Sequence, residues 1–170
     1  LQKYYLENEA IETVYFGGGT PSLLPMKDLK SQISQLRRFY NITETAEITL
    51  EANPDDITEE ILAGWKEIGI NRLSIGVQSF FEEDLRWMNR AHNAAQAITC
   101  LEMATRCFTN ISIDLIYGTP HLTNEKWKQN VGTALTFNIP HLSCYALTVE
   151  PKTPLDKLIR QKQSEDINPD

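Results

Sequence analysis

The sequence is short of several residue types and patterns, and each shortage excludes a class of protein. It has only 3 cysteines in 170 residues, an odd and widely spaced set that is typical of reduced thiols in a cytoplasmic protein rather than of a disulfide framework. Its 16 basic and 23 acidic residues give a net charge of −7, which argues against capture of a nucleic-acid backbone. No apolar run approaches the roughly 20 residues of a membrane span, and no signal peptide opens the chain.

Short apolar runs alternate with amphipathic helical patterns along the chain. We expect strands at 13–16, 47–52, 72–77, 111–117 and 141–149, and helices over 26–40, 61–68, 97–108 and 127–135. Strands that alternate with helices predict right-handed crossovers, a parallel sheet and an α/β fold. A closed barrel of eight strands needs roughly 250 residues. The length therefore predicts an open sheet or an arc cut from a barrel, with unpaired edges at the first and last strands that favour self-association.

Polar residues or glycines stand at the carboxyl end of each expected strand, although a parallel sheet buried on both faces should be apolar there. The first strand ends in three glycines, and Glu51, Gln78 and Asp114 lie in or just after the next three. Any one buried carboxylate is ordinarily satisfied by backbone donors. Because ligands bind at the carboxyl ends of parallel strands, the convergence of three such residues predicts a single binding site.

The segment GGGTPS at 17–22 raises the question of what approaches the bare backbone so closely. It lacks the Lys-Ser/Thr pair of a phosphate loop and the spacing of a dinucleotide fingerprint. The glycines therefore predict backbone groups that touch a small polar ligand group. With carboxylates and a glutamine opposite, that ligand should offer ammonium or hydroxyl donors, as an amino acid joined to a ribose does.

The remaining conspicuous residues are expected to be structural. The 3 histidines lack ligand-like spacing, and His141 begins a strand, at the end away from the predicted site. Tyr117, Trp127 and Tyr145 are expected to pack in the core. The cysteines are expected to behave as small buried hydrophobes.

Five segments, in this order, resemble a known family: YFGGGTPSLL, EITLEANP, GINRLSIGVQSF with NRAH after it, ISIDLIYGTP, and PHLSCYALTVEPKTPL. Together they span positions 15–155. The chain resembles radical S-adenosylmethionine (SAM) enzymes of the HemN/HemW group, meaning oxygen-independent coproporphyrinogen III oxidase and its heme-chaperone relative. The resemblance implies a partial TIM-like (β/α) barrel of the radical SAM type, with parallel strands and outer helices, open as an arc in this chain.

The resemblance also implies a SAM site and no catalytic side chain in this chain. Eight residues match family positions that contact SAM: Gly18, Gly19, Thr20, Glu51, Gln78, Arg90, Asp114 and Thr148. The two glycines, the threonine and the glutamate would surround the methionine amino group, and the arginine would face the methionine carboxylate. The glutamine and the aspartate would hold the ribose hydroxyls. The last threonine would touch the adenine, chiefly through its backbone.

One family motif is missing from the chain. The family binds a [4Fe-4S] cluster through a Cys-x3-Cys-x2-Cys loop upstream of GGGTP, and Cys100, Cys107 and Cys144 do not form such a triad. The chain begins at Leu1 without a methionine. We therefore expect residues 1–170 to be a fragment of the radical SAM core domain, with the cluster cysteines upstream, the C-terminal domain downstream, and no metal site or SAM cleavage of its own.

For the whole protein, the resemblance implies reductive cleavage of SAM to a 5′-deoxyadenosyl radical. In the oxidase branch this leads to decarboxylation of the propionates of coproporphyrinogen III, whereas the chaperone branch binds and delivers heme. The segments EANP, RAH and HLSCYALTVEPKTPL favour the chaperone branch. A noncatalytic binding module with this fold is a third interpretation. The implied partners are SAM, a tetrapyrrole (heme or coproporphyrinogen III) and a reductant protein, with neither nucleic acid nor a membrane span.

Overall fold

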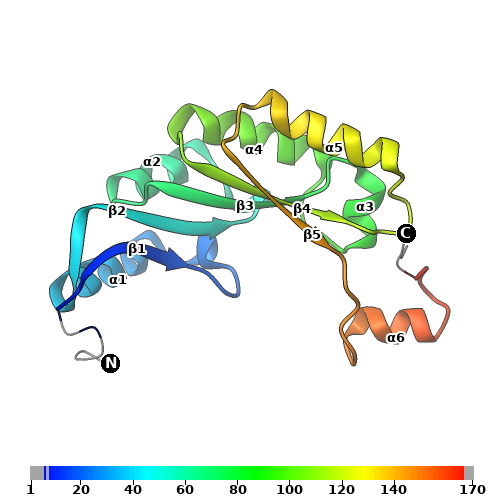
Figure 1. The fold of residues 1–170 in the computed structure, drawn as a ribbon, viewed down its shortest axis with the longest axis horizontal. Helices are drawn as coiled ribbons and strands as arrows, with labels where there is room; N and C mark the ends of the chain where they lie inside the picture. The colour runs from blue at the N-terminus through cyan, green and yellow to red at the C-terminus, as the bar shows by residue number, and fades with distance from the viewer. Residues whose placement is uncertain (1–5, 7, 167–170) are drawn as a thin grey trace.

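The computed structural model describes residue 6 and residues 8–166. Five parallel strands form one sheet in the order β1-β2-β3-β4-β5, so that each strand pairs with its neighbours in the sequence. The strands are β1 (Ala10–Phe16), β2 (Asn41–Ala52), β3 (Arg72–Gln78), β4 (Ile111–Tyr117) and β5 (His141–Ala146). The expected arc of parallel strands is confirmed, and the sheet curls into a half-barrel with β1 and β5 at its edges (Figure 1).

Helices connect the strands and cover the convex side of the sheet, and one more helix, α6, follows the last strand. They are α1 (Met26–Phe39), α2 (Glu59–Glu67), α3 (Glu82–Trp87), α4 (Ala94–Cys107), α5 (Asn124–Thr136) and α6 (Pro154–Arg160), with 3-10 turns η1 (Pro21–Leu23) and η2 (Pro54–Asp56). Figure 1 shows α2, α4 and α5 along the convex side, and α6 below the end of β5. Among the described residues, no helix combines the length and the apolar character that a membrane crossing requires.

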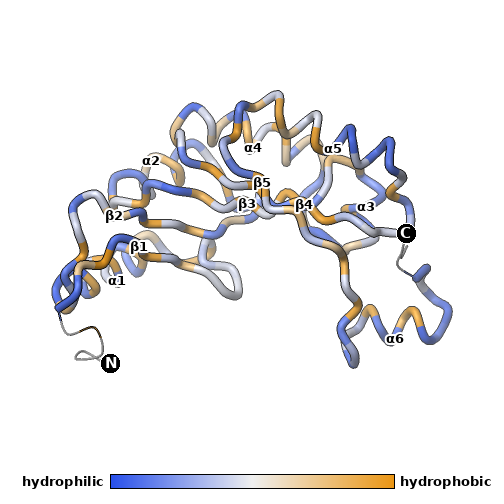
Figure 2. Tube along the Cα trace, viewed as in Figure 1, coloured by the Kyte–Doolittle hydropathy of each residue, from blue (hydrophilic) through white to orange (hydrophobic). Residues whose placement is uncertain are grey.

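The hydrophobic core lies between the sheet and these helices. Side chains alternate along a strand, so that Ile48 and Leu50 of β2 point into the core with Leu73 and Ile75 of β3, all at most 1% exposed. Leu29 of α1, Leu62 and Trp65 of α2, and Leu101 of α4 close the core from the other side. The mixed colouring of the α4 and α5 turns in Figure 2 follows from this one-sided burial.

The opposite, concave face of the sheet carries polar side chains. Glu47, Thr49 and Glu51 alternate with the core residues of β2, and Ser74 and Gln78 do the same on β3. A parallel sheet with helices on both faces would be apolar on both. Here one face is left for a polar site.

The structure differs from the expected elements mainly at their ends. The second strand begins at Asn41, six residues earlier than expected, and the fifth ends at Ala146 rather than at residue 149. The short helices α3 and α6 were not expected, because six or seven residues show little periodicity. Two helix ends have recognisable caps: the Thr123 side chain accepts a hydrogen bond from the Lys126 amide at the start of α5, and Gly69 follows α2 with φ +99°.

Three side-chain expectations are wrong. Tyr117 and Tyr145 are 42% and 56% exposed instead of packed in the core, because they lie at the open carboxyl end and on the edge strand. Cys144 is exposed on β5, whereas Cys100 is buried as expected. Trp127 does pack against the core.

Candidate functional site

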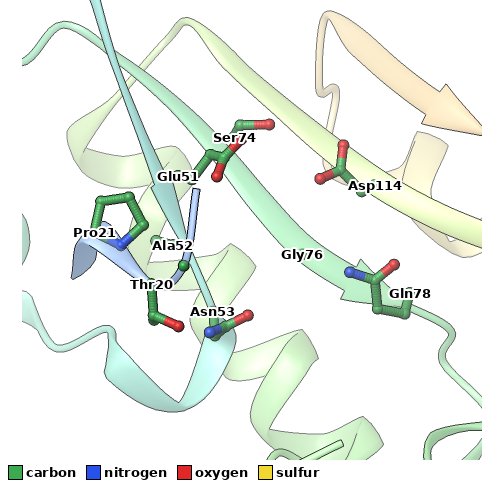
Figure 3. A pocket seen from close by; sticks show the side chains of 10 residues that line it. Thr20, Pro21, Glu51, Ala52, Asn53, Ser74, Gly76, Gln78 and Asp114 are labelled. Carbon is green, nitrogen blue, oxygen red and sulfur yellow. The ribbon is translucent and has the colours of Figure 1, made fainter. Parts of the chain in front are cut away.

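A polar hollow of about 170 Å³ opens at the carboxyl ends of the strands. Its lining comes from the glycine loop after β1 and from the ends of β2, β3 and β4: Gly19, Thr20, Pro21, Glu51, Ala52, Asn53, Ser74, Gly76, Gln78 and Asp114. Figure 3 shows the side chains of Glu51, Gln78 and Asp114 arranged around this hollow. We call it the carboxyl-end pocket.

The glycine loop is shaped by two different constraints. Gly18 and Gly19 have φ values of +82° and +66°, a left-handed backbone that residues with a Cβ adopt at a cost. At Gly17 the constraint is space, because an added Cβ would lie 2.6 Å from Cε1 of Tyr15 and 2.9 Å from Oε1 of Glu51. The protein's own tyrosine and glutamate therefore approach the bare backbone at the first glycine, whereas the space around the other two is open.

Glu51 is fixed by two donors at the end of β2. Its Oε2 accepts a hydrogen bond from the Gly18 amide at 3.0 Å, and its Oε1 accepts one from the Tyr15 hydroxyl at 2.9 Å. Burial and this hydrogen bond raise the pKa of the Tyr15 phenol, so it is a donor at neutral pH. An ionised carboxylate has about four acceptor sites. Glu51 therefore keeps acceptor capacity for a cationic ligand group.

Asp114 faces Glu51 from β4. Burial raises the pKa of its carboxyl group, the Glu51 charge adds to this, and a hydroxyl contact with Ser143 opposes it. Behind it, the Ser112 hydroxyl lies 2.7 Å from Nδ1 of His141 and 3.2 Å from the Ser143 hydroxyl. The carboxylate thus lies at the end of a row of polar groups. The His141 side chain, at the start of β5, is partnered by the Ser112 hydroxyl of β4, which agrees with the expected structural role of this histidine.

Gln78 ends β3 in a strained conformation. Its φ is +68°, and the Ser79 amide donates to the Val77 carbonyl at 2.9 Å across it, so the residue is the centre of a tight γ-turn. His92 also contacts that carbonyl, with Nε2 at 3.0 Å. A Cβ at Gly76 would lie 2.8 Å from the Gln78 Nε2, so the amide of Gln78 folds over the bare backbone of Gly76.

Arg90 lies beside the pocket rather than in it. It lines a neighbouring groove of about 670 Å³ that also contains Ile116, which is two residues beyond Asp114 on the same face of β4, and Leu147. Burial lowers the pKa of the Arg90 guanidinium, and the negative charges of Asp114 and Asp55 counteract the shift. The cation and the Asp114 carboxylate therefore belong to one electrostatic environment.

The structure brings most of the predicted site residues together. Gly19, Thr20, Glu51, Gln78 and Asp114 line the carboxyl-end pocket. Gly18 reaches it through its hydrogen bond to Glu51, and Arg90 stands on the wall of the neighbouring groove. Thr148 is exposed beyond the end of β5 and is in neither hollow.

Sequence reasoning missed several residues of the pocket. No ligand role was predicted for Asn53, Ser74 and Gly76, which line the pocket, or for Tyr15, which donates to Glu51 beside it. Alternation along β3 could have identified two of them, because Ser74, Gly76 and Gln78 share one face of the strand. The position of Tyr15 depends on how β1 pairs with β2, which spacing alone does not fix.

The described residues do not offer a metal site. Within residue 6 and residues 8–166, no three His, Cys, Asp or Glu side chains gather where they could hold an ion. Cys100 is buried in the core, which raises the pKa of its thiol to about 12, so it is no thiolate ligand. Cys107 and Cys144 are on α4 and β5. The polar pocket can hold a small organic ligand instead.

Comparison with known proteins places this geometry in a family context. Residues 1–133 match the family described as the radical SAM superfamily. The chain is 38% identical over 153 residues to the heme chaperone HemW of Bacillus subtilis (strain 168) and 35% identical over 150 residues to that of Escherichia coli (strain K12). These alignments cover 89% and 88% of this chain and 40% of each relative, so the chain spans about two fifths of their length.

A solved structure has the same arrangement of strands and helices. Coproporphyrinogen III oxidase (HemN) from Escherichia coli, whose title describes it as a radical SAM enzyme, superimposes with a TM-score of 0.76 at 29% sequence identity. The superposition covers 91% of this chain and 39% of that protein. An archaeal Elp3 from Methanocaldococcus infernus gives a TM-score of 0.74 at 19% identity, which supports the fold alone.

Proposed function

This chain belongs to the radical SAM superfamily, and from that premise we propose that its carboxyl-end pocket binds S-adenosylmethionine. The observation that carries the proposal is the convergence of Glu51, Gln78 and Asp114 around one hollow beside the glycine loop. An ammonium group suits the Glu51 carboxylate, and ribose hydroxyls suit a carboxylate and a carboxamide. SAM carries both kinds of group.

In this proposal the methionine amino group lies between Glu51 and the backbone of Gly18, Gly19 and Thr20. The pocket of about 170 Å³ is smaller than the roughly 300–1,000 Å³ of sites that bury a drug-sized ligand. The ligand would therefore extend along the strand ends into the groove lined by Arg90, whose guanidinium is proposed to face the methionine carboxylate.

At the other end of the ligand, the side chains of Gln78 and Asp114 are proposed to hold the ribose hydroxyls. The backbone of Thr148 is proposed to contact the adenine. That assignment rests on the resemblance alone, since Thr148 lies outside both hollows.

The superfamily implies a [4Fe-4S] cluster as a second cofactor, which supplies the electron for reductive cleavage of SAM. The described residues do not fit such a cluster. Cys100 and Cys107 are on α4, Cys144 is on β5, and no three ligating side chains among the described residues gather where they could hold a metal. We propose that residues 1–170 are part of the radical SAM core domain and that the cluster ligands lie outside them.

For the whole protein we propose heme binding and delivery in the cytoplasm. The support is the identity of 35–38% to proteins named heme chaperone HemW, over nearly nine tenths of this chain. A tetrapyrrole and a protein reductant would then be its partners. Oxidative decarboxylation of coproporphyrinogen III is the second candidate, favoured by the structural match to HemN at 29% identity.

The SAM proposal can be tested by binding to the chain itself. Calorimetric titration with SAM should show one site, and Glu51→Gln should weaken it at least tenfold, because a hydrogen bond to a charged group contributes about 1.5–3 kcal/mol. The matched control is Glu102→Gln, the same substitution at an exposed residue of α4, which should leave the affinity unchanged. A folded chain that does not take up SAM contradicts the proposal.

The two candidate activities need the whole protein with its cluster assembled. Heme titration followed by Soret absorbance, together with incubation with SAM and coproporphyrinogen III, separates them. Stoichiometric heme binding without protoporphyrinogen formation supports the chaperone, and turnover to protoporphyrinogen IX supports the oxidase. SAM uptake with neither result would leave a noncatalytic binding module.

A further inference from the structure

A cluster of four completely buried polar side chains lies outside the pocket. Ser79, Asp84, Thr119 and Asn130, here called the Asp84 cluster, are each 0% exposed. The Asp84 carboxylate accepts hydrogen bonds from the Ser79 hydroxyl at 2.8 Å and from the Thr119 hydroxyl at 2.7 Å. The Asn130 amide donates to the Ser79 oxygen at 3.1 Å. Ser79 is therefore the centre of the cluster.

The Asp84 cluster also holds the backbone that follows β3. The Phe80 backbone amide donates to the side-chain Oδ1 of Asn130 at 2.7 Å, and the Phe81 backbone amide donates to the Ser79 hydroxyl oxygen at 3.1 Å. Asp84 comes from α3, Asn130 from α5, and Thr119 from the turn after β4. Four separate segments thus meet at the residue directly after Gln78.

Stability alone is a weak reason for such a cluster. Taking a carboxylate out of water costs several kcal/mol, and the donors to Asp84 are two neutral hydroxyls. Apolar residues of similar volume often stabilise a core at least as well as buried charged groups. What a fully satisfied polar network adds is one defined arrangement of the segments it joins.

The segment that needs such definition is the turn at Gln78. A residue with a Cβ at φ +68° is strained, and such strain persists only where the surroundings hold it. His92 fixes the Val77 carbonyl before the turn, and the Asp84 cluster fixes Ser79, Phe80 and Phe81 after it. The Gln78 side chain, 7% exposed, is left to cover Gly76 and line the pocket.

We propose that the Asp84 cluster is a positioning device that, through Ser79, holds Gln78 in its strained turn with its amide at the pocket. Ser79, Asp84 and Asn130 are thus positioning residues for ligand binding, and none of them touches the ligand. The inference rests on the proposed SAM site, because it concerns the orientation of a residue assigned to that ligand.

The test is a double-mutant cycle on the chain, read by SAM affinity and by urea unfolding. Ser79→Ala removes the centre of the cluster and should weaken SAM binding about tenfold, as should Gln78→Ala. The double variant Gln78→Ala/Ser79→Ala should bind SAM no more weakly than Gln78→Ala alone, because the residue being positioned is gone. The control is Asn71→Ala, which removes two side-chain hydrogen bonds to the β2 backbone before β3 begins and contacts no member of the cluster.

The possible outcomes are distinct. If Ser79→Ala lowers the SAM affinity by the same factor in both backgrounds, or if Asn71→Ala lowers it as much, the cluster is merely structural and the inference is wrong. If the unsubstituted chain folds but does not bind SAM, the proposed function itself fails. If Ser79→Ala does not fold, Asn130→Ala can replace it in the double-mutant cycle with Gln78→Ala. Asn130→Ala removes the acceptor of the Phe80 amide but keeps the hydrogen bond from Ser79 to Asp84.

Discussion

Replacing Gly17 by alanine tests why the glycine loop is bare at its first position. The φ of Gly17 is outside the left-handed region, so the added methyl group acts through space alone. It would lie 2.6 Å from the Tyr15 ring and 2.9–3.0 Å from the Glu51 carboxyl group, and both must move. The ring is 55% exposed and can turn away, so we expect unfolding stability to fall by about 1 kcal/mol, at the low end of the cost of overpacking.

The effect on the ligand should be larger than the effect on stability. Displacing Glu51 breaks its hydrogen bonds to the Gly18 amide and the Tyr15 hydroxyl, and the carboxylate then no longer faces the pocket. Hydrogen bonds to charged groups contribute about 1.5–3 kcal/mol, so SAM affinity should fall at least tenfold. Calorimetric titration gives the affinity, and urea unfolding gives the stability.

Gly132→Ala is the matched control for this prediction. Gly132 is in the interior of α5, and a Cβ there would meet nothing within 4 Å. The same substitution should therefore raise the free energy of unfolding by about 0.5–1 kcal/mol and leave SAM binding unchanged. If Gly17→Ala matches the unsubstituted chain in both SAM affinity and stability, the contact of Gly17 with Tyr15 and Glu51 does not constrain the site as described.

Three further predictions follow from single features. Gly76→Ala should push the Gln78 amide aside and weaken SAM binding with little loss of unfolding stability; equal affinity in titration would show that this amide is not needed. Burial lowers the pKa of His92 below its ordinary value of about 6.5, so the folded chain binds a proton at this imidazole less readily than the unfolded chain does. The free energy of unfolding should therefore be highest above about pH 6.5 and fall as the pH drops below it. Urea unfolding at a series of pH values should show a shallower fall in His92→Gln than in the unsubstituted chain. The edges of β1 and β5 should cause association at high concentration, which light scattering would contradict by recording a clean monomer.

The sequence by itself determined the class of fold and most of the site. The alternation of apolar strand runs with helical periodicity was enough to predict a parallel sheet. Strands and helices have different hydrophobic periods, and a strand–helix–strand connection is almost always right-handed. Glu51, Gln78 and Asp114 were predicted to converge for the same reason, since the ends of parallel strands meet at one edge.

Tertiary structure alone decided what each residue contacts. The three consecutive glycines predicted a close approach, but only the pairing of β1 with β2 places the Tyr15 ring and the Glu51 carboxylate over Gly17. The Asp84 cluster joins residues up to 51 positions apart, from the ends of two strands and from two helices, and no local pattern marks Ser79 and Asn130 as partners. The spacing of apolar residues predicts whether a segment is a helix or a strand and which of its faces is buried. Contacts between segments far apart in the sequence depend on how those faces pack together.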